Sequence, residues 1–327
     1  MIESRFFHAC ILGLGVLVVL IATGAGMVRH LAHTPSLRAE PQYLYIEPGM
    51  GVKRVSRLAH DVGLVGAAWH FNLIVRLKGM DRSLLSGEYE VLPGQTLEQT
   101  LTQIRKRDVY LHRLVIPEGQ SVSEVMDILK GAYGLDLDGL TAPVEGSLLP
   151  DTYFYERGDR AVAVVERMKN AMTEALLAAW EVRDADLPFA SVEEALVMAS
   201  IVEKETAVPS ERPLVAAVFI NRLRKGMRLQ SDPTVIYGIT GGTALDRPIS
   251  RADLRAMTPY NTYRVSGLPP TAIANPGRES IKAVMNPADV PYLYFVADGT
   301  GGHAFASTLD EHNRNVARWR QIERDSR

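Results

Sequence analysis

Residues 191–206 read Ser-Val-Glu-Glu-Ala-Leu-Val-Met-Ala-Ser-Ile-Val-Glu-Lys-Glu-Thr. Ser191, followed three residues later by Glu194, forms a capping-box pattern, which predicts the start of a helix. The helix is apolar on nearly all sides, so we expect it to be buried inside a domain. Glu203 and Glu205 leave its C-terminal end on different faces, each beside apolar neighbours, and helical periodicity does not choose between them.

A carboxyl group in such surroundings can act as a proton donor. An unperturbed glutamate has a pKa of about 4.3, so only about 0.2% of it is protonated at pH 7. Desolvation raises the pKa, and at a pKa of about 6 roughly 10% of the group would be ready to donate, as in glycosidases. The alternative is a purely structural ion pair, for example with Lys204 or Arg212.

A second helix is predicted directly afterwards. Ser210 can cap it, Pro213 lies in its first turn, and Gly226 ends it. Residues 227–238 follow, Met-Arg-Leu-Gln-Ser-Asp-Pro-Thr-Val-Ile-Tyr-Gly. Amide, hydroxyl and aromatic groups in one turn are typical of sugar binding, because the polar groups hydrogen-bond and tyrosine stacks on a ring face. The same residues are also good turn formers, so a structural role stays open.

Three short units resemble one another in the N-terminal half: a strand, a Pro/Gly turn and an amphipathic helix. Their strand and turn segments are residues 43–49, 89–94 and 114–119. Thr96 and Ser121 stand at the expected helix starts. Such units form small α+β modules. These modules either bind a ligand or have a purely structural role. Residues 130–145 are rich in Gly and Asp and mark a boundary.

The N-terminus carries a long apolar run. Residues 6–28 are 23 positions without Lys, Arg, Asp or Glu, which as a helix span about 34 Å, enough for a hydrocarbon core of about 30 Å. A cleaved signal peptide, with residues 22–25 as small-residue cleavage context, is the alternative. Cys10 precedes the most apolar part of the run, residues 11–21, whereas a lipoprotein cleavage site needs the opposite order, so we do not expect lipidation there. The flanking charges do not fix the orientation.

Composition narrows the classes of function. The 327 residues suit about two domains. With 36 basic and 38 acidic side chains the net charge is −2, so a nucleic-acid partner is not expected. A single cysteine allows no intrachain disulfide. The histidines show no zinc-binding spacing and no phosphate-binding glycine loop is present, so we expect neither a metal nor a cofactor.

The C-terminal part predicts a β-hairpin. Residues 292–296 and 303–305 are the two strands, and residues 298–302 are the turn. We expect the aromatic side chains of this hairpin to belong to a core more readily than to a sugar platform.

Many ordered segments resemble the endolytic murein transglycosylase (YceG-like) family. They are residues 145–153, 199–206, 211–213, 218–223, 226–238, 260–263, 267–270, Ile273, 291–296 and 301–305. The similarity extends over essentially the whole chain, including the N-terminal anchor. One departure stands out: Leu148 and Leu149 occupy positions where relatives often carry aromatic residues.

The resemblance implies an α+β fold in three parts: a cytoplasmic stub and transmembrane helix at 1–30, a small LysM-like module at 40–135, and a larger YceG-like catalytic domain at 140–327. It also implies a single-pass inner-membrane protein with its C-terminal bulk in the periplasm, acting on peptidoglycan and partnering penicillin-binding wall synthases. Glu205, the second glutamate of Glu-Lys-Glu, matches the catalytic acid of the family.

The expected activity is that of a lytic transglycosylase, a lyase that cuts the MurNAc–GlcNAc β-1,4 bond within nascent strands, leaves 1,6-anhydroMurNAc ends and terminates elongation. We expect substrate contacts from Glu203, Gln230, Ser231, Asp232, Tyr237 and Asn261. Two alternatives remain open. One is a muramidase, in which Asp232 or Asp151 activates water. The other is a non-catalytic scaffold that binds glycan and wall synthases.

Overall fold

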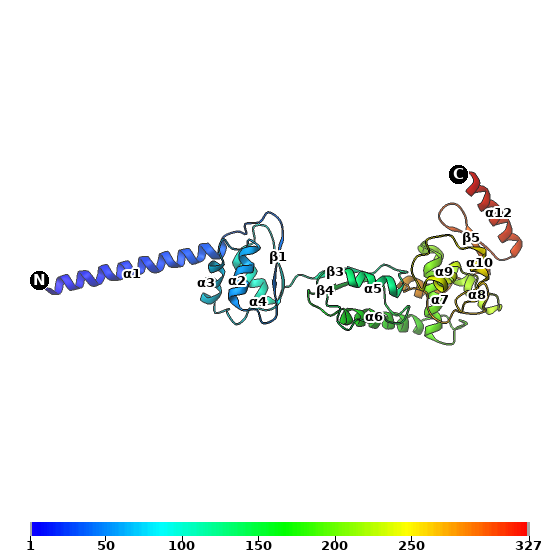
Figure 1. Ribbon diagram of the computed structural model, residues 1–327, viewed down its shortest axis with the longest axis horizontal. Coiled ribbons are helices and arrows are strands. Elements are labelled where there is room, and N and C mark those ends of the chain that lie inside the picture. The colour runs from blue at the N-terminus through cyan, green and yellow to red at the C-terminus, as the bar shows by residue number, and fades with distance from the viewer. Residues whose placement is uncertain (1, 326–327) are drawn as a thin grey trace. The chain divides into compact units, whose positions relative to one another are not determined.

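The computed structural model describes residues 2–325, and its contacts divide the chain into two compact units between His112 and Arg113. Residue 1 of the predicted anchor and residues 326–327 of the predicted catalytic domain lie outside the described residues. Both units contain helices and strands (Figure 1). The predicted α+β class is therefore confirmed.

The first unit contains a long N-terminal helix and a small module. Its elements are α1 (Ile2–His33), β1 (Gln42–Ile46), α2 (Val52–Asp61), α3 (Ala68–Leu77), β2 (Gly87–Val91) and α4 (Leu97–Lys106). Strands β1 and β2 pair antiparallel, with Leu44 opposite Tyr89. Both side chains are fully buried against Phe71 of α3 and Leu101 of α4. The first two predicted units thus share one core.

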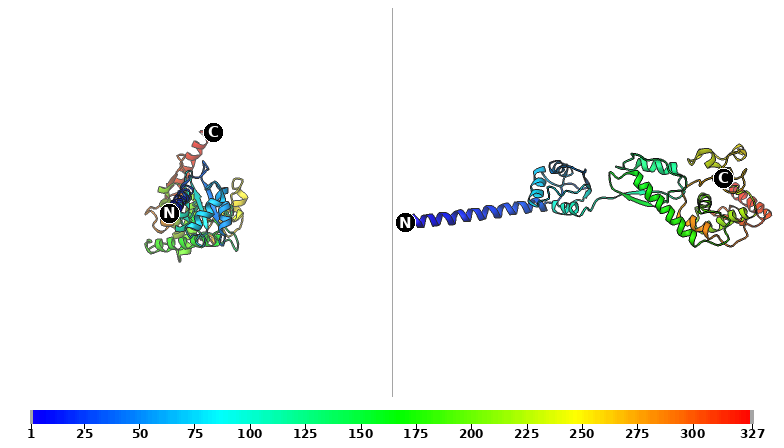
Figure 2. Two further views of the ribbon diagram at one scale, coloured as in Figure 1. Left: turned by 90° about the vertical axis from the view of Figure 1, so that its left-hand side faces the viewer. Right: turned by 90° about the horizontal axis from the view of Figure 1, so that it is seen from below.

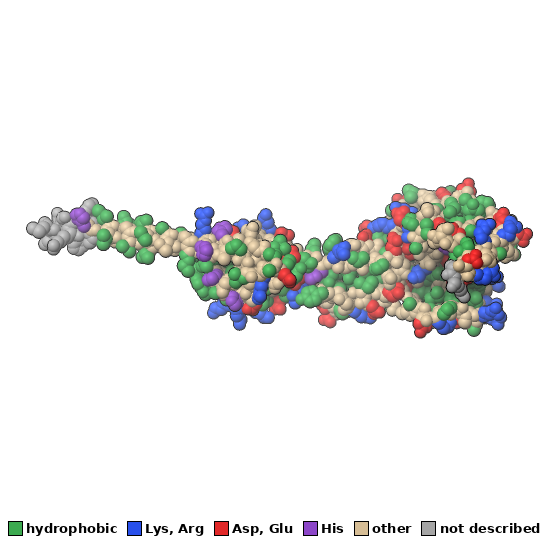
Figure 3. All heavy atoms as spheres, turned by 90° about the horizontal axis from the view of Figure 1, so that it is seen from above, with side chains coloured by type: hydrophobic (Ala, Val, Ile, Leu, Met, Phe, Trp, Pro, Cys, Tyr) green, Lys and Arg blue, Asp and Glu red, His purple; other side chains and the backbone are tan. Residues whose placement is uncertain are grey.

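Helix α1 exposes its apolar side chains. The stretch Ile11–His33 is long and apolar enough to cross a membrane. The protein buries none of its most apolar part. Figure 3 shows hydrophobic side chains along the described part of α1. Only the C-terminal end of α1 contacts the module, where Ala32 joins the core beside α3 and α4. The helix is a candidate membrane span.

The second unit begins with a small layer. Its elements are β3 (His112–Val115), α5 (Val122–Gly131), β4 (Thr152–Tyr155) and α6 (Ala161–Glu181). Strand β3 pairs with β4, and α5 and α6 pack against this pair (Figure 2). The third predicted strand–turn–helix unit therefore lies in the second compact unit, because its partners β4 and α6 come later in the chain. The predicted boundary near residues 135–140 stays a prediction.

The rest of the second unit is mainly helical. Its elements are α7 (Val192–Glu205), a 3-10 helix (Pro209–Glu211), α8 (Arg212–Arg224), α9 (Asp232–Thr240), α10 (Arg251–Arg255), α11 (Arg278–Met285), β5 (Tyr294–Ala297), β6 (His303–Ala306) and α12 (Leu309–Asp325). Helix α6 joins the two layers, since its N-terminal half packs in the small layer and its C-terminal half against α7 and α11. Leu148 and Leu149 are both fully buried.

Helix caps test the sequence signals directly. Thr96 and Ser121 each form a complete capping box, with Gln99 and Glu124 respectively. Ser191 also caps α7, but Glu194 accepts from the backbone N–H of Ala190 and not from Ser191, so that box is incomplete. Two further predictions concern α8 and the hairpin.

The predicted cap at Ser210 is wrong. Residues Pro209–Glu211 form a 3-10 turn, and α8 begins after Glu211 with no side-chain cap. Pro213 does lie in the first turn, as expected. The predicted hairpin is present: β5 and β6 pair antiparallel, with Phe295 opposite Phe305. Phe295 packs edge-on against Phe219 of the buried helix α8, at 5.8 Å between ring centres.

Candidate active site

The candidate site lies at the C-terminal end of α7. This helix packs against α8 and α11 and buries Met198, Ile201 and Val202 completely. The hydroxyl of Ser200 donates to the carbonyl of Val197 at 2.7 Å and accepts from the backbone N–H of Ile273 at 3.0 Å. The last turn of α7 is therefore fixed by core packing and by a buried hydrogen bond from a distant loop.

Glu205, the last residue of α7, faces one hydroxyl group. Ser231 Oγ donates to Glu205 Oε1 at 2.5 Å. Burial raises the pKa of Glu205 from 4.5 to about 7, against the opposing effect of the Ser231 hydrogen bond. The charge of Asp232 raises the pKa further, whereas His303 and Arg222 lower it. A carboxyl with this pKa is about half protonated at neutral pH.

Ser231 is held firmly in place. It is buried and precedes α9, and its backbone N–H donates to the hydroxyl of Thr262 at 2.9 Å. The residue before it, Gln230, has a left-handed backbone with φ of 55°. Few side chains adopt this conformation, and such strain often occurs at functional sites. The Gln230 side chain is exposed.

Asp232 and Tyr263 form a second pair beside Glu205. Tyr263 donates its hydroxyl proton to Asp232 Oδ1 at 2.7 Å. Burial, followed by the hydrogen bond to Asp232, raises the pKa of Tyr263 above its usual range. The negative charge of Asp232 disfavours ionisation of Glu205.

Arg222 is a buried cation that the sequence did not single out. Its Nε donates to the carbonyl of Leu293 at 2.7 Å, and its Nη1 donates to the carbonyl of Leu229 at 2.5 Å. These bonds tie the start of the hairpin to the segment before Ser231. Arg222 and Arg224 both lie in the last turn of α8, where cations are favoured for electrostatic reasons alone, so their position in the sequence does not distinguish Arg222.

Glu203 has different partners from Glu205. Its Oε2 accepts from the backbone N–H of Gly277 at 2.9 Å, and its Oε1 lies 3.7 Å from Arg212 Nη2. Arg212 also pairs with Glu118 at 3.2 Å. The ion pair that the sequence allowed for either glutamate is therefore made by Glu203. The structure does not bring Glu203 together with Ser231.

Tyr237 lies further along α9. Its hydroxyl donates to Glu145 Oε2 at 3.3 Å, and its ring is 4.9 Å from the ring of Tyr260. Tyr237, Glu145 and Lys130 line a cavity of about 370 Å³. Burial raises the pKa of Glu145. Tyr237 thus contacts the carboxyl group of Glu145, and the described residues show no hydrogen bond between Tyr237 and Glu205.

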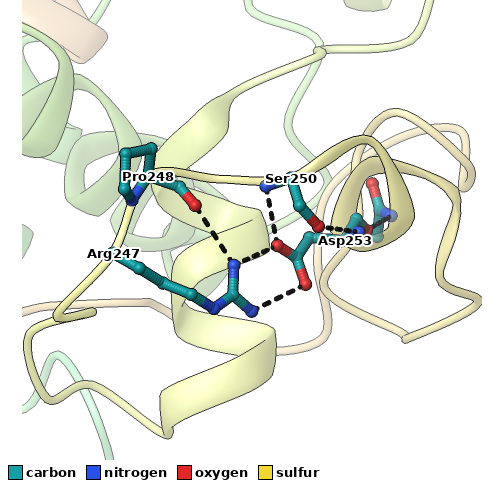
Figure 4. Close-up of polar contacts among 5 residues, drawn as sticks. Arg247, Pro248, Ser250 and Asp253 are labelled. Atoms are coloured by element: carbon teal, nitrogen blue, oxygen red, sulfur yellow. Dashed lines mark hydrogen bonds and ion pairs between the residues drawn. The ribbon is translucent and has the colours of Figure 1, made fainter.

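Asn261 is buried and organises a loop. Its Nδ2 donates to the carbonyls of Asp253, Leu254 and Ala256 at 3.2, 3.2 and 2.7 Å, and its Oδ1 accepts from the backbone N–H of Tyr263 at 3.0 Å. Figure 4 shows the turn on which it acts, where Arg247 and Ser250 hold the carboxylate of Asp253. Asn261 therefore shapes the loop that carries Thr262 and Tyr263.

The described residues contain no group of three or more His, Cys, Asp or Glu side chains placed to hold a metal ion. A half-protonated carboxyl group, one hydroxyl donor and one neighbouring carboxylate suit proton transfer to and from a bound ligand.

Comparisons with known proteins agree with one another. The model of the YceG-like family matches residues 44–318. An endolytic murein transglycosylase of Bacillus subtilis is 31% identical over 263 residues, covering 77% of this chain and 72% of the relative. One of Streptococcus pneumoniae strain D39 is 28% identical over 321 residues, covering 83% of this chain and 57% of the relative. The crystal structure of a yceG-like protein from Listeria monocytogenes matches with a TM-score of 0.50 and 29% identity, covering 85% of this chain and 99% of that one.

Replacement of Glu205 by glutamine should stabilise the protein at alkaline pH. The folded-state pKa of about 7 lies above the usual 4.5, so the folded state binds more protons between these values and loses stability as pH rises through them. At about 1.4 kcal/mol per pKa unit, Glu205→Gln should gain on the order of 2–3 kcal/mol relative to wild type between pH 4 and pH 8. Urea unfolding at both pH values measures this gain. An equal effect at both would contradict a buried, proton-binding carboxyl, and exposed Glu193→Gln on the same helix is the control.

Proposed function

The chain belongs to the YceG-like family, and from this premise we propose that it is a peptidoglycan lytic transglycosylase, a lyase that uses Glu205 as its catalytic acid. The finer proposal is endolytic cleavage of the MurNAc–GlcNAc β-1,4 bond within nascent strands, which leaves 1,6-anhydroMurNAc ends and ends elongation. The names of the relatives, endolytic murein transglycosylases, support this activity. The observation that carries it here is the buried Glu205 carboxyl with a pKa of about 7.

One carboxyl group can carry both proton transfers. Protonated Glu205 donates to the glycosidic oxygen as the bond from C1 to that oxygen breaks. The C6 hydroxyl of the same muramic sugar attacks C1, and its proton passes to the Glu205 carboxylate. The acid is thereby regenerated and no water is consumed. An intramolecular nucleophile replaces the second carboxylate that ordinary glycosidases require, and its closeness to C1 contributes much of the acceleration.

The other carboxylates considered for the reaction already have hydrogen-bond or ion-pair partners, which favours the mechanism with one catalytic glutamate over a muramidase mechanism. The second acid of a muramidase must activate water. Asp232 accepts a hydrogen bond from Tyr263 at 2.7 Å, and Asp151 accepts from the backbone N–H of Thr152 at 2.7 Å. Glu203 is held by Arg212 and Gly277. Each of these carboxylates is held by a hydrogen bond or an ion pair to other groups, whereas Glu205 accepts a hydrogen bond only from the hydroxyl of Ser231.

Substrate contacts are proposed mainly around α9. Ser231 orients the Glu205 carboxyl, exposed Gln230 and Asp232 contact sugar hydroxyl groups, and Tyr237 extends the binding surface towards Glu145. For Asn261 and Glu203, whose polar atoms already have protein partners, we propose positioning of the loop and of α7 in place of direct sugar contact.

Membrane attachment completes the proposal. We propose that α1 spans the inner membrane once and that residues after 33 work in the periplasm, on strands made by penicillin-binding wall synthases. The antiparallel β1–β2 pair with α2 and α3 between its strands supports a small LysM-like glycan-binding module. A reporter enzyme that is active only outside the cytoplasm, fused after Arg327, reads this orientation. An inactive fusion that is stably expressed would contradict it.

Glu205→Gln should abolish product formation. The glutamine cannot donate or accept the transferred proton, so we expect the cleavage rate to fall by about 10²–10⁴-fold or more. Uncrosslinked glycan is incubated with each protein, and the product ends are identified by mass. Anhydro ends from wild type support the proposal, reducing ends support the muramidase, and unchanged activity of Glu205→Gln would favour the scaffold. Glu193→Gln serves as the matched control.

The pH dependence should follow ionisation of the same group. Because protonated Glu205 is the donor, kcat/KM should fall as pH rises above about 7, the pKa of the carboxyl. Ser231→Ala removes a hydrogen bond that stabilises the ionised form, so the alkaline limb should move to higher pH. Rate profiles of wild type, Ser231→Ala and the exposed control Thr173→Ala test this. A limb that stays in place or moves to lower pH in Ser231→Ala would be inconsistent with the assignment.

A further inference from the structure

A second carboxylate, Glu211, lies close to Glu205 and is saturated with hydrogen bonds. It precedes α8. Its Oε1 accepts from the backbone N–H of His303 at 2.8 Å, and its Oε2 accepts from Thr206 Oγ1 at 3.2 Å and lies 2.7 Å from His303 Nδ1. A Cβ on Gly302 would lie 2.6 Å from Glu211 Oε1. The hairpin turn can approach this carboxylate so closely only because residue 302 is glycine.

The Glu211 carboxylate faces Nδ1 of the His303 ring at 2.7 Å. Burial acts to raise the pKa of Glu211, but the hydrogen bonds from the side chain and backbone of His303 outweigh it and the pKa is lowered. An ionised carboxylate only accepts hydrogen bonds, so His303 Nδ1 must carry the proton. In a neutral imidazole held this way, the other nitrogen, Nε2, keeps its lone pair and is an acceptor.

Nε2 of His303 is the unused side of this pair. The described residues offer it no hydrogen-bond partner, and it is not among their buried, unsatisfied atoms. The side chain is 19% exposed. Its ring meets Phe295 and Phe305 at 5.3 and 6.4 Å between ring centres, both at steep angles. An oriented acceptor with aromatic neighbours and access to solvent is well suited to a sugar hydroxyl.

The position of His303 connects it with the proposed proton donor, Glu205. Thr206 directly follows Glu205, and its hydroxyl shares Glu211 Oε2 with the imidazole. Two hydrogen bonds therefore separate the ring of His303 from the residue next to Glu205. The hairpin that carries His303 is thereby connected to the end of α7 that carries Glu205.

We propose that His303 is a further substrate-contacting residue of the Glu205 site: its Nε2 accepts a hydrogen bond from a hydroxyl group of the bound glycan. Glu211 is the positioning residue, which acts through His303 by holding the Nδ1–H tautomer. This inference rests on the proposed function. It adds to the site a group from the β5–β6 hairpin. This group orients the sugar without taking its proton.

Two substitutions distinguish the roles of the two nitrogens in the His303 ring. In His303→Asn the side-chain amide can still donate to Glu211 from near the Nδ1 position, but nothing replaces Nε2. In His303→Gln the amide reaches towards the Nε2 position and loses the contact with Glu211. A purely structural role predicts that asparagine keeps activity. The proposal predicts that His303→Asn melts like wild type but loses about 10- to 100-fold in kcat.

The experiment uses the full-length purified chain with uncrosslinked glycan. Steady-state rates and melting curves are recorded for wild type, His303→Asn, His303→Gln, Glu211→Gln and the double variant His303→Asn/Glu211→Gln. If the effect of Glu211 on catalysis passes through His303, the double variant should lose no more than His303→Asn alone, and a larger loss would point to its bond with Thr206. His60→Asn, at an exposed histidine of α2, is the matched control.

Nitrogen-15 NMR of the imidazole gives a readout that does not depend on catalysis. Wild type should show the Nδ1–H tautomer, and Glu211→Gln should lose this preference. An Nε2–H tautomer in wild type, or His303→Asn with wild-type kcat and KM, would overturn the inference. Wild type and Glu205→Gln separate this outcome from failure of the proposed function: if wild type forms anhydro ends and Glu205→Gln does not, only the role of His303 is lost.

Discussion

The structure depends on one costly arrangement, a largely desolvated carboxyl group with a single hydroxyl as its hydrogen-bond partner. Burying an ionised carboxylate without a countercharge is unfavourable, so the group holds its proton instead. Glu203 and Glu205 show the two possible outcomes two residues apart on one helix. Glu203 meets Arg212 and a backbone N–H of Gly277. Glu205 meets only Ser231, and its pKa rises to about 7. The first glutamate anchors the helix, and the second is left able to donate a proton.

Several distant segments must meet to maintain this environment. The backbone turn at Gln230 directs Ser231 towards Glu205, Thr262 holds the N–H of Ser231, and Asn261 shapes the loop that carries Thr262. Arg222 joins this region to the hairpin through two carbonyl groups. The residues that touch Glu205 are few, and most of the polar network around them serves to keep them there. A few contacts held by a larger polar network suit a catalytic acid that must donate and accept a proton without moving.

Local signals predicted the elements well, because caps, turns and periodicity depend on neighbouring residues. The helix after Ser191, the three strand–turn–helix units and the hairpin are all present. Ser210 failed as a cap because the chain forms a 3-10 turn there. The site was harder, since its contacts join residues far apart in sequence: Tyr263 with Asp232, and His303 with Glu211 across 92 positions. Periodicity left Glu203 and Glu205 equivalent, and only tertiary packing gave Arg212 to one and Ser231 to the other.

The most direct test of this account is the ionisation of the Glu205 carboxyl itself. Carbon-13 NMR of the glutamate side chains, recorded against pH in wild type and with Glu205→Gln to assign the signal, measures its pKa without substrate. The account predicts a midpoint of about 7. A midpoint near 4.5, the ordinary value for a glutamate in water, would show that the carboxyl is solvated and would remove the proton donor on which the proposed chemistry depends.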